Sequence, residues 1–451
     1  MKVKVKKLLI IQKDEAYFLF ETLQVLEKNH QAFKDFQLTI LADSVAIKSN
    51  REKLNPFTKA LTSEIGPVLN DKFDISVNLS MSESSWDLHG EVKSDIKIGP
   101  YNKEGQLVVE DLWSTYLLTL KAKAPFLSFH LQDIYKNIFG IKNIIKENHS
   151  RTTIKQIAIG TCSTHFFSVN EQERFINLIS NRFPGVPLKD LTEIDLIDDV
   201  SSTLYIGASN LESLKLCEAG AKGIFLFSSF QGFNLVPFSG QHLIVSSNGI
   251  QLNADHVLRI VDSELSNKSF FESAYPTYRI DHETFHGAYI KSLNHSDNNY
   301  PFYQAHLVLW NFLLNVSDVQ LDVSKCSDAQ LALLKTNYDI LTKFIRLYDY
   351  AMASVDTIHQ ESKSKLMDIT KIEGHLKNLK EIDKISDQLA STQSLLRPFL
   401  DFYRIRRSQN FGENLFDQSQ TSFLTYAEEH HALKGLQELF FVTLRKNEVN
   451  L

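Results

Sequence analysis

The chain has 451 residues, 43% of them hydrophobic and 23% charged, and its formal net charge is -6. This length exceeds the roughly 100–200 residues of a typical domain, so two or three folded domains are expected, and the composition excludes a largely disordered chain. The acidic balance excludes a global positive field that would recruit nucleic acid, and no stretch reaches the ~20 apolar residues that span a bilayer.

The first third of the chain alternates apolar runs of strand length with segments of helical periodicity. An apolar run from Leu8 to Ile11 follows the basic start; it is too short for a signal-peptide core and predicts a buried strand. The expected strands are 5–12, 37–41, 73–79 and 96–99, and the expected helices are 15–28, 113–120 and 131–139. This alternation predicts a parallel sheet in an N-terminal Rossmann-like domain, residues 1–147.

The same pattern restarts after a polar stretch, which predicts a second Rossmann-like domain at residues 148–300. The expected strands are 154–160, 204–207 and 223–228, and the expected helices are 171–182 and 211–219. Small polar residues follow each of these strands, at the end where open α/β sheets bind ligands. The fold class is therefore α/β with two such domains.

Strand signals disappear from about Phe302 onward, which predicts a helical appendage at residues 301–451. Apolar residues recur every three or four positions from Leu366 to Leu389, as in an amphipathic helix that Arg397-Pro398 ends or kinks. The appendage either packs on the α/β body or forms a coiled-coil arm. Gly374 interrupts the short heptad pattern and favours packing on the body.

Cysteine and histidine give no sign of a metal site. The three cysteines are widely spaced without a Cys-x-x-Cys pair, which fits a reducing cytoplasm. The adjacent His430 and His431 point to different faces of the helix expected there, so we expect surface histidines.

A series of short segments carries a resemblance to a known family. These are Phe73–Leu79, Ser84-Ser85, Ile96–Gly99, Gly105–Trp113, Tyr116–Leu118, Asp133–Tyr135, Leu204–Ser209, Gly220, Ile224–Phe227 and Pro237-Phe238. In order and spacing they resemble glycosyltransferase family 9, the family of the lipopolysaccharide heptosyltransferases. The resemblance covers residues 5 to about 265 and leaves out the helical appendage.

The resemblance implies a GT-B-like arrangement, two Rossmann-like domains facing a cleft, and an enzyme that needs neither metal nor cofactor. A nucleotide-diphosphate sugar would bind the second domain as donor, and a glycan or glycolipid acceptor would bind the first. Such chemistry needs a helix amino terminus to stabilise the leaving diphosphate and a carboxylate to take the acceptor's proton. A lipid-linked acceptor would place the protein in the cytoplasm, peripherally at the inner face of the cytoplasmic membrane.

The family carries a Gly-Asp pair after the first strand, and its Asp is the expected catalytic base. An ungapped register puts Tyr17 and Phe18 at this pair. Asp14 and Glu15, one turn earlier, are therefore the candidate catalytic residues. As acids at a helix start, both equally serve the helix dipole and the N-cap.

Candidate nucleotide-sugar-binding residues follow the strands of the second domain. The family's second signature, Asp, then Ser or Thr, then Gly, with a His three residues further on, falls here on Ser209, Asn210, Leu211 and Leu214. Ser209 and Asn210 can hydrogen-bond a phosphate, although Ser209 is also a good N-cap. The two leucines lack the donors and close backbone approach that an anion requires.

Three further loops complete the candidate donor site. In the first loop the family often has hydroxyl side chains followed by a lysine. Thr161 and Ser163 supply the hydroxyls here, and His165-Phe166-Phe167 stands in the region of the lysine. Glu193 either reaches a nucleotide ribose or is a solvated loop acid. Ser228 opens a loop of small polar residues whose backbone donors can hold phosphate, as such loops commonly do.

Two classes of function fit these residues. The first is a glycosyltransferase that moves a heptose or hexose to a lipopolysaccharide or other surface-glycan acceptor. The second is a non-catalytic relative that uses the inherited fold to bind a partner. A third hypothesis is peripheral membrane contact, because Arg404, Arg406 and Arg407 lie near aromatic residues of the appendage, although ordinary helix surfaces show the same composition.

Overall fold

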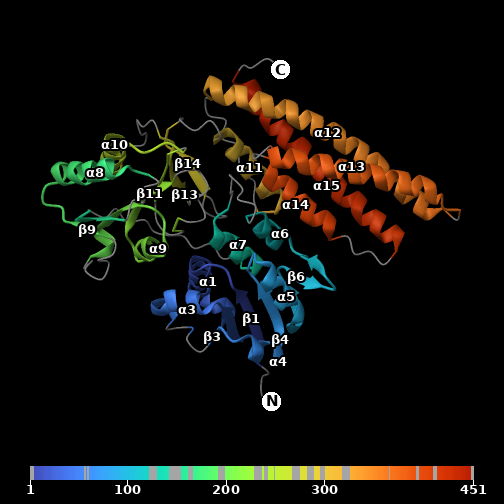
Figure 1. The fold of residues 1–451 in the computed structure, drawn as a ribbon, viewed down its shortest axis with the longest axis horizontal. Coiled ribbons are helices and arrows are strands. Elements are labelled where there is room, and N and C mark those ends of the chain that lie inside the picture. The colour runs from blue at the N-terminus through green and yellow to red at the C-terminus, as the bar shows by residue number, and fades with distance from the viewer. Residues whose placement is uncertain are drawn as a thin grey trace. The chain divides into compact units, whose positions relative to one another are not determined.

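The computed structural model divides into two compact units (Figure 1). The first unit comprises Met1–Phe126, Ile134–Ile141 and Pro301–Leu451, and the second comprises Leu127–Asp133 and Lys142–Tyr300. The structure describes residues 5–54, 57, 60–120, 129–141, 154–160, 166–190, 199–227, 236–237, 242–247, 249–266, 275–281, 289–294, 300–316, 326–364, 366–392, 396–409 and 414–447. The N-terminal sheet and the C-terminal helices therefore share one unit.

The first unit contains a five-stranded parallel sheet of order β3-β2-β1-β4-β5. Its strands are β1 (Lys6–Gln12), β2 (Phe36–Ala42), β3 (Leu61–Thr62), β4 (Lys72–Asn78) and β5 (Lys93–Ile98). Its helices are α1 (Ala16–Lys28), α2 (His30–Phe33), α3 (Ser44–Ser49), α4 (Ile65–Asn70), α5 (Glu83–Glu91), α6 (Leu112–Thr119) and α7 (Leu131–Ile138), with a 3-10 turn, η1 (Arg51–Leu54). Buried Leu9, Ile11, Leu41 and Phe73 form part of the core against one face of this sheet.

An antiparallel hairpin follows β5 and consists of β6 (Tyr101–Lys103) and β7 (Gln106–Val108). Glu104 and Gly105 form its two-residue loop with φ of 53° and 80°. Positive φ at both positions is the mark of a type I′ turn, whose twist suits a tight hairpin.

The second unit contains a seven-stranded sheet of order β14-β13-β12-β11-β10-β8-β9. Strands β8 (Gln156–Ile159), β9 (Leu188–Asp190), β10 (Thr203–Gly207), β11 (Lys222–Phe227) and β12 (Leu243–Ser246) are parallel, while β13 (Thr277–Asp281) and β14 (Tyr289–Ser292) are antiparallel. The helices are α8 (Val169–Arg182), α9 (Leu211–Glu218) and α10 (Ala254–Leu265), with a 3-10 turn, η4 (Val200–Ser202). The expected α/β class with two Rossmann-like sheets is thus confirmed, and the two antiparallel strands are an addition that the sequence did not predict.

The C-terminal helices are α11 (Tyr300–Leu313), α12 (Asp328–Lys363), α13 (Ile369–Thr392), α14 (Arg397–Ser408) and α15 (Leu415–Lys446). The three longest, α12, α13 and α15, form a bundle in which α12 packs on both others (Figure 1). Arg397-Pro398 does not kink the amphipathic helix, because α13 ends at Thr392 and the proline lies in the first turn of α14. Proline is tolerated there since the first N–H groups of a helix have no partner within it.

The helical region packs on the first α/β sheet domain rather than standing apart as an arm. Helix α14 contacts α6, and the ring of Trp310 on α11 lies 4.9 Å from that of Tyr116 on α6. The Val109 amide donates a hydrogen bond to the Gln409 side chain at 2.7 Å. The expected packing on the α/β body is therefore what the structure shows.

The stretch suggested to touch a membrane has its aromatic side chains buried and its arginines in ion pairs. Phe399, Phe402 and Tyr403 are buried. Arg407 forms an ion pair with buried Glu429, while Arg406 pairs with Glu428 and Arg404 with Asp401. The aromatic rings of this stretch therefore belong to the core, and membrane contact through its arginines stays a prediction.

Candidate active site

The first unit has a topological switch point between β1 and β4, where the strand order reverses. We call this place the first switch point. Open α/β sheets bind ligands outside the carboxyl ends of their strands at such points. Asp14 and Glu15 follow β1 there, and Ser80 and Met81 follow β4. The two candidate bases therefore lie where this fold class binds ligands.

Gln12, the last residue of β1, is fully buried and joins the two loops. Its side-chain amide donates to the Tyr135 hydroxyl at 2.8 Å, and its carbonyl oxygen accepts from the Ser80 hydroxyl at 3.3 Å. The Ser80 hydroxyl also accepts from the Lys13 amide at 2.6 Å. Buried polar groups whose hydrogen bonds are all made favour a single conformation of the segments that carry them. The network fixes the backbone from which Asp14 projects.

Asp14 and Glu15 have different environments. The half-buried Asp14 carboxylate accepts a hydrogen bond from the Met81 amide at 2.9 Å and so connects the loops after β1 and β4. Glu15 occupies the N-cap position of α1, but its exposed side chain makes no capping hydrogen bond. Of the two acids, Asp14 has the more defined orientation at the first switch point.

Tyr17, which the ungapped register puts at the family's base position, lies half-buried beside Phe18, with ring centroids 4.0 Å apart. Burial, followed by the negative charges of Glu21 and Glu15, raises the pKa of Tyr17 well above its ordinary value. A neutral phenol donates a hydrogen bond rather than accepting a proton. Tyr17 is thus suited to orient a ligand and unsuited to act as a base.

Sequence reasoning missed Gln12 and Tyr135 as site residues. Tyr135 on α7 is fully buried, and burial raises its pKa well above the ordinary value, so its hydroxyl stays protonated. The available signals were a polar residue at the end of an otherwise apolar strand and the position of Tyr135 within the family-like Asp133–Tyr135 segment. Neither signal indicates that the two side chains meet.

In the second unit, Ser209 and Asn210 precede α9. The N-cap of α9 is Asn210 and not Ser209, which corrects the expectation. The Asn210 side chain accepts from the Ser213 amide at 2.8 Å, and the Ser213 hydroxyl accepts from the Asn210 amide at 2.9 Å. This capping box uses two of the donors that an anion would otherwise meet at the helix start. Leu214 is buried on the same helix.

At the second switch point, between β8 and β10, a tyrosine side chain packs against the carboxyl ends of both strands. Tyr205 on β10 is fully buried, and its hydroxyl donates to the carbonyl of Ala208 at 2.5 Å. A Cβ atom on Gly160 would lie 2.2 Å from this hydroxyl, and one on Gly207 would lie 2.6 Å from it. The two glycines at the strand ends therefore make room for the Tyr205 ring.

The remaining candidates of the donor site are Thr161, Ser163, Glu193 and Ser228, and all four lie outside the described residues. Nearby, Phe167 is buried in the core of the second unit, where its ring stacks on that of Phe175 at 5.4 Å. Phe167 is thus a core residue of the second unit.

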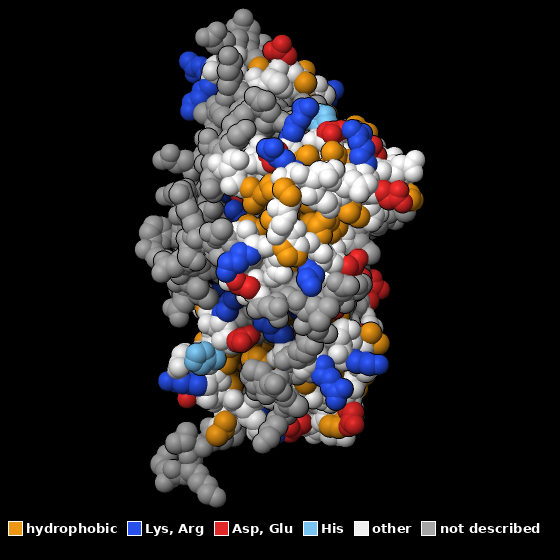
Figure 2. All heavy atoms as spheres, turned by 90° about the vertical axis from the view of Figure 1, so that its left-hand side faces the viewer, with side chains coloured by type: hydrophobic (Ala, Val, Ile, Leu, Met, Phe, Trp, Pro, Cys, Tyr) orange, Lys and Arg blue, Asp and Glu red, His pale blue; other side chains and the backbone are white. Residues whose placement is uncertain are grey.

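Within the described part of the chain, no group of three or more His, Cys, Asp or Glu residues is placed to hold a metal ion. No described helix is both long and apolar enough to cross a membrane. On the face drawn in Figure 2, basic and acidic side chains are interspersed among the residues shown. An anion binding on that face would rely on local donors rather than on a broad positive field.

No protein-family model matches the chain, and no curated protein matches it. Among solved structures it is similar to E. coli heptosyltransferase WaaC with ADP, at 10% identity and a TM-score of 0.35 over 58% of this chain and 98% of that chain. The structure of E. coli heptosyltransferase WaaC with ADP-2-deoxy-2-fluoro heptose gives 10% identity and a TM-score of 0.35 over 57% and 99%. This is a distant likeness, and membership of family 9 stays a prediction from the sequence.

Proposed function

We propose that the chain is a metal-independent glycosyltransferase that moves a heptose or hexose from a nucleotide-diphosphate sugar to a lipopolysaccharide or other surface-glycan acceptor. The observation that carries the proposal is the Asp14 carboxylate, which projects at the first switch point and is oriented by the Met81 amide. A lipid-linked acceptor places the protein in the cytoplasm, at the inner face of the membrane.

In the proposed reaction, an acceptor hydroxyl bound to the first unit attacks the anomeric carbon of the donor. The bond from that carbon to the phosphate oxygen breaks, and the nucleoside diphosphate leaves with the electron pair. Asp14 takes the hydroxyl proton, and Tyr17 donates a hydrogen bond to the acceptor. Exposed Glu15 is the alternative base.

The donor's diphosphate is proposed to bind the second unit. Ser209 and Asn210 lie at the start of α9, where the helix dipole favours negative charge. From the resemblance, the hydroxyls of Thr161, Ser163 and Ser228 also contact the phosphates, and Glu193 contacts the ribose. No cofactor beyond the donor substrate takes part.

A non-catalytic binding protein is the second candidate, and the packing of Tyr205 at the second switch point favours it. Tyr205 occupies the space between Gly160 and Gly207, and the capping box of Asn210 and Ser213 satisfies donors at the start of α9. A protein with this fold but without transferase activity does not require free backbone donors or free space for a diphosphate at this place.

Ligand titration separates the two candidates. A transferase should be stabilised by one class among ADP, UDP, GDP and their sugars, by about 2.7 kcal/mol when the ligand is at a hundred times its Kd. Differential scanning fluorimetry and calorimetry measure this shift. A protein stabilised by none of these nucleotides at millimolar concentration contradicts the transferase proposal.

The base is then identified by substitution. Asp14→Asn keeps an oxygen that can accept from the Met81 amide and removes the basic carboxylate, so sugar transfer should fall by about 10²-fold or more while folding is unchanged. Glu15→Gln should have a small effect. Asp71→Asn, at the opposite end of β4, is the matched control. Equal transfer rates in Asp14→Asn and the unsubstituted protein would remove Asp14 from the mechanism.

A further inference from the structure

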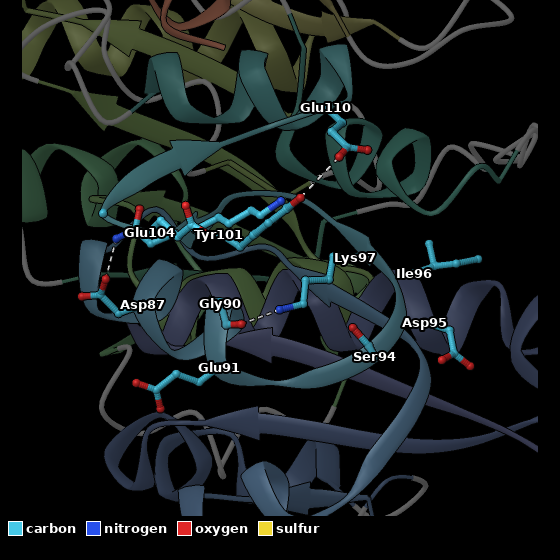
Figure 3. A pocket seen from close by; sticks show the side chains of 13 residues that line it. Asp87, Gly90, Glu91, Ser94, Asp95, Ile96, Lys97, Tyr101, Glu104 and Glu110 are labelled. Carbon is cyan, nitrogen blue, oxygen red and sulfur yellow. Dashed lines mark hydrogen bonds between the residues drawn. The ribbon is translucent and has the colours of Figure 1, made fainter. Parts of the chain in front are cut away.

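A cavity of about 1000 Å³ lies beside β5 in the first unit, away from the first switch point (Figure 3). Its walls come from the end of α5, from β5 and from the β6–β7 hairpin. The lining residues are Asp87, Gly90, Glu91, Ser94, Asp95, Ile96, Lys97, Tyr101, Asn102, Lys103, Glu104, Gly105 and Glu110. This volume is at the upper end of the range of ligand sites.

The cavity follows the edge of β5 that lies away from β4. The consecutive residues 94–97 of this strand all line it. Side chains alternate between the two faces of a strand, so a space that touches four consecutive residues runs along the strand's edge. In the described sheet β5 is the last strand and pairs only with β4. Within the described residues, no strand pairs with its other edge.

Charged residues on an edge strand usually prevent pairing with other chains. On β5 two of them are turned to other partners. The Lys97 ammonium donates to the carbonyls of His89 and Gly90, both at 2.6 Å, and Asp95 pairs with Lys72 at 2.7 Å. Ile96 between them is exposed and offers an apolar contact.

The walls of the cavity are preformed. A Cβ atom on Gly90 would lie 2.1 Å from the Asn102 carbonyl oxygen, so the hairpin backbone packs directly on α5. Asn102 also donates to the Asp87 carboxylate at 2.5 Å, and the Tyr101 hydroxyl donates to Glu110 at 3.3 Å. A ligand entering here meets walls that are already ordered, which reduces the entropy lost on binding.

The charge of the lining selects the ligand. It carries five carboxylates and two ammonium groups, a net charge of -3, and Lys97 is already engaged. Such a lining disfavours nucleotide-sugars and other anions and favours a cationic partner. Glu91, at the end of α5, and Glu104, in the loop of the hairpin, are exposed.

We propose that this cavity binds an extended basic peptide segment, which adds as a strand to this edge of β5. The backbone of the partner pairs with β5, its lysine or arginine side chains meet Glu91 and Glu104, and an alternate apolar side chain covers Ile96. Backbone pairing supplies affinity, and the alternating side chains supply specificity. The proposal does not depend on the glycosyltransferase function.

The test uses the full chain and a fluorescent peptide of about ten alternating lysines and valines, a common strand length, at about 0.15 M salt. Fluorescence anisotropy should show saturable binding. A peptide with glutamate in place of lysine should not bind. The same lysine peptide with alternate amides N-methylated loses its donors for strand pairing, so its Kd should rise by about tenfold or more.

Substitutions locate the site. Glu91→Lys combined with Glu104→Lys should raise the Kd by about tenfold or more, whereas Glu64→Lys, an exposed acid elsewhere in the first unit, should change it by less than roughly twofold. Absence of binding overturns the proposal, and so does an unchanged Kd in the double variant. Two further results would overturn the proposal: equal binding of the N-methylated peptide, and displacement of the lysine peptide by spermine at equal charge concentration. Either would show that the cavity holds any polycation without strand pairing.

Discussion

The two switch points are built from the same strand arrangement and are held together in opposite ways. At the first, the buried amide of Gln12 connects β1 to α7 through Tyr135 and to the loop after β4 through Ser80. At the second, the ring of Tyr205 fills the space above two glycines. The first is held by directed hydrogen bonds, and the second by the packing of an aromatic ring. The strand ends at a switch point can thus be held by buried polar groups in one unit and by a packed aromatic side chain in the other.

The comparison predicts that added volume damages the second switch point most. Gly160→Ala places a Cβ 2.2 Å from the Tyr205 hydroxyl and 2.9 Å from two ring carbons. Overpacking of this kind should lower the free energy of unfolding by about 3 kcal/mol or more. Urea denaturation measures the loss, and hydrogen exchange should place it in β8 and β10. Gly66→Ala, with no atom near its added Cβ, is the control, and an equal effect of both substitutions would contradict this account.

Acid should weaken the first unit through its buried histidine, His89. Buried His89 donates from Nδ1 to the Pro100 carbonyl and accepts at Nε2 from Ser76, and burial lowers its pKa to about 4. The unfolded chain binds the proton near pH 6.5, so stability is full above that pH and falls as the pH drops toward about 4. The free energy of unfolding should fall by about 3 kcal/mol in total over this pH range. Denaturation at pH 7.5 and 4.5 measures it.

His89→Gln is the variant that sharpens the pH prediction, because it removes the titrating imidazole. The slope of stability between pH 6.5 and about 4 should shrink in this variant and persist when the exposed His30 is replaced by Gln. Hydrogen exchange should place the effect of acid in β4 and α5. An unchanged slope in His89→Gln would show that other groups control the acid response.

Loss of polarity should damage the first switch point. Gln12→Leu keeps a side chain of similar volume. It removes the donor to the Tyr135 hydroxyl and the acceptor of the Ser80 hydroxyl in a buried site. The expected cost is about 2 kcal/mol. The comparison is with Gln37→Leu, an exposed glutamine on β2. Faster hydrogen exchange at β1 and β4 in Gln12→Leu alone supports the network, and equal stability of both variants argues against it.

The smallest expected effect is at the second switch point when only polarity changes. Tyr205→Phe keeps the ring and removes one hydrogen bond to the Ala208 carbonyl, so it should cost about 1 kcal/mol. In the Tyr205→Phe background, Gly207→Ala should also cost less than alone, since the hydroxyl is the side-chain atom nearest its added Cβ. A double-mutant cycle measures the coupling, and additive effects would show that the hydroxyl does not limit the space.

The sequence predicted the parallel sheets and the helical C-terminal region because these depend on local periodicity. The apolar runs of β1 and β10 and the three- and four-residue spacing of α13 are readable within one segment. The contacts of the candidate site cannot be predicted from one segment, because they join residues far apart in the sequence. Gln12 meets Tyr135 across 123 positions, and Tyr205 reads as one more apolar residue of a buried strand unless its distance to Gly160 is known. The sequence also cannot show that Asn210 rather than Ser209 is the N-cap, since both residue types favour it.

The hydrogen bond between Val109 and Gln409 joins residues 300 positions apart. During translation, helix α6 therefore leaves the ribosome long before α14 can cover it. At roughly 5–20 residues per second the wait is on the order of 15–60 s. The second unit, whose residues from 142 to 300 are contiguous, can complete its sheet within this interval. The first unit to begin emerging is thus the last to close, and its uncovered α6 surface is where a chaperone would meet the nascent chain.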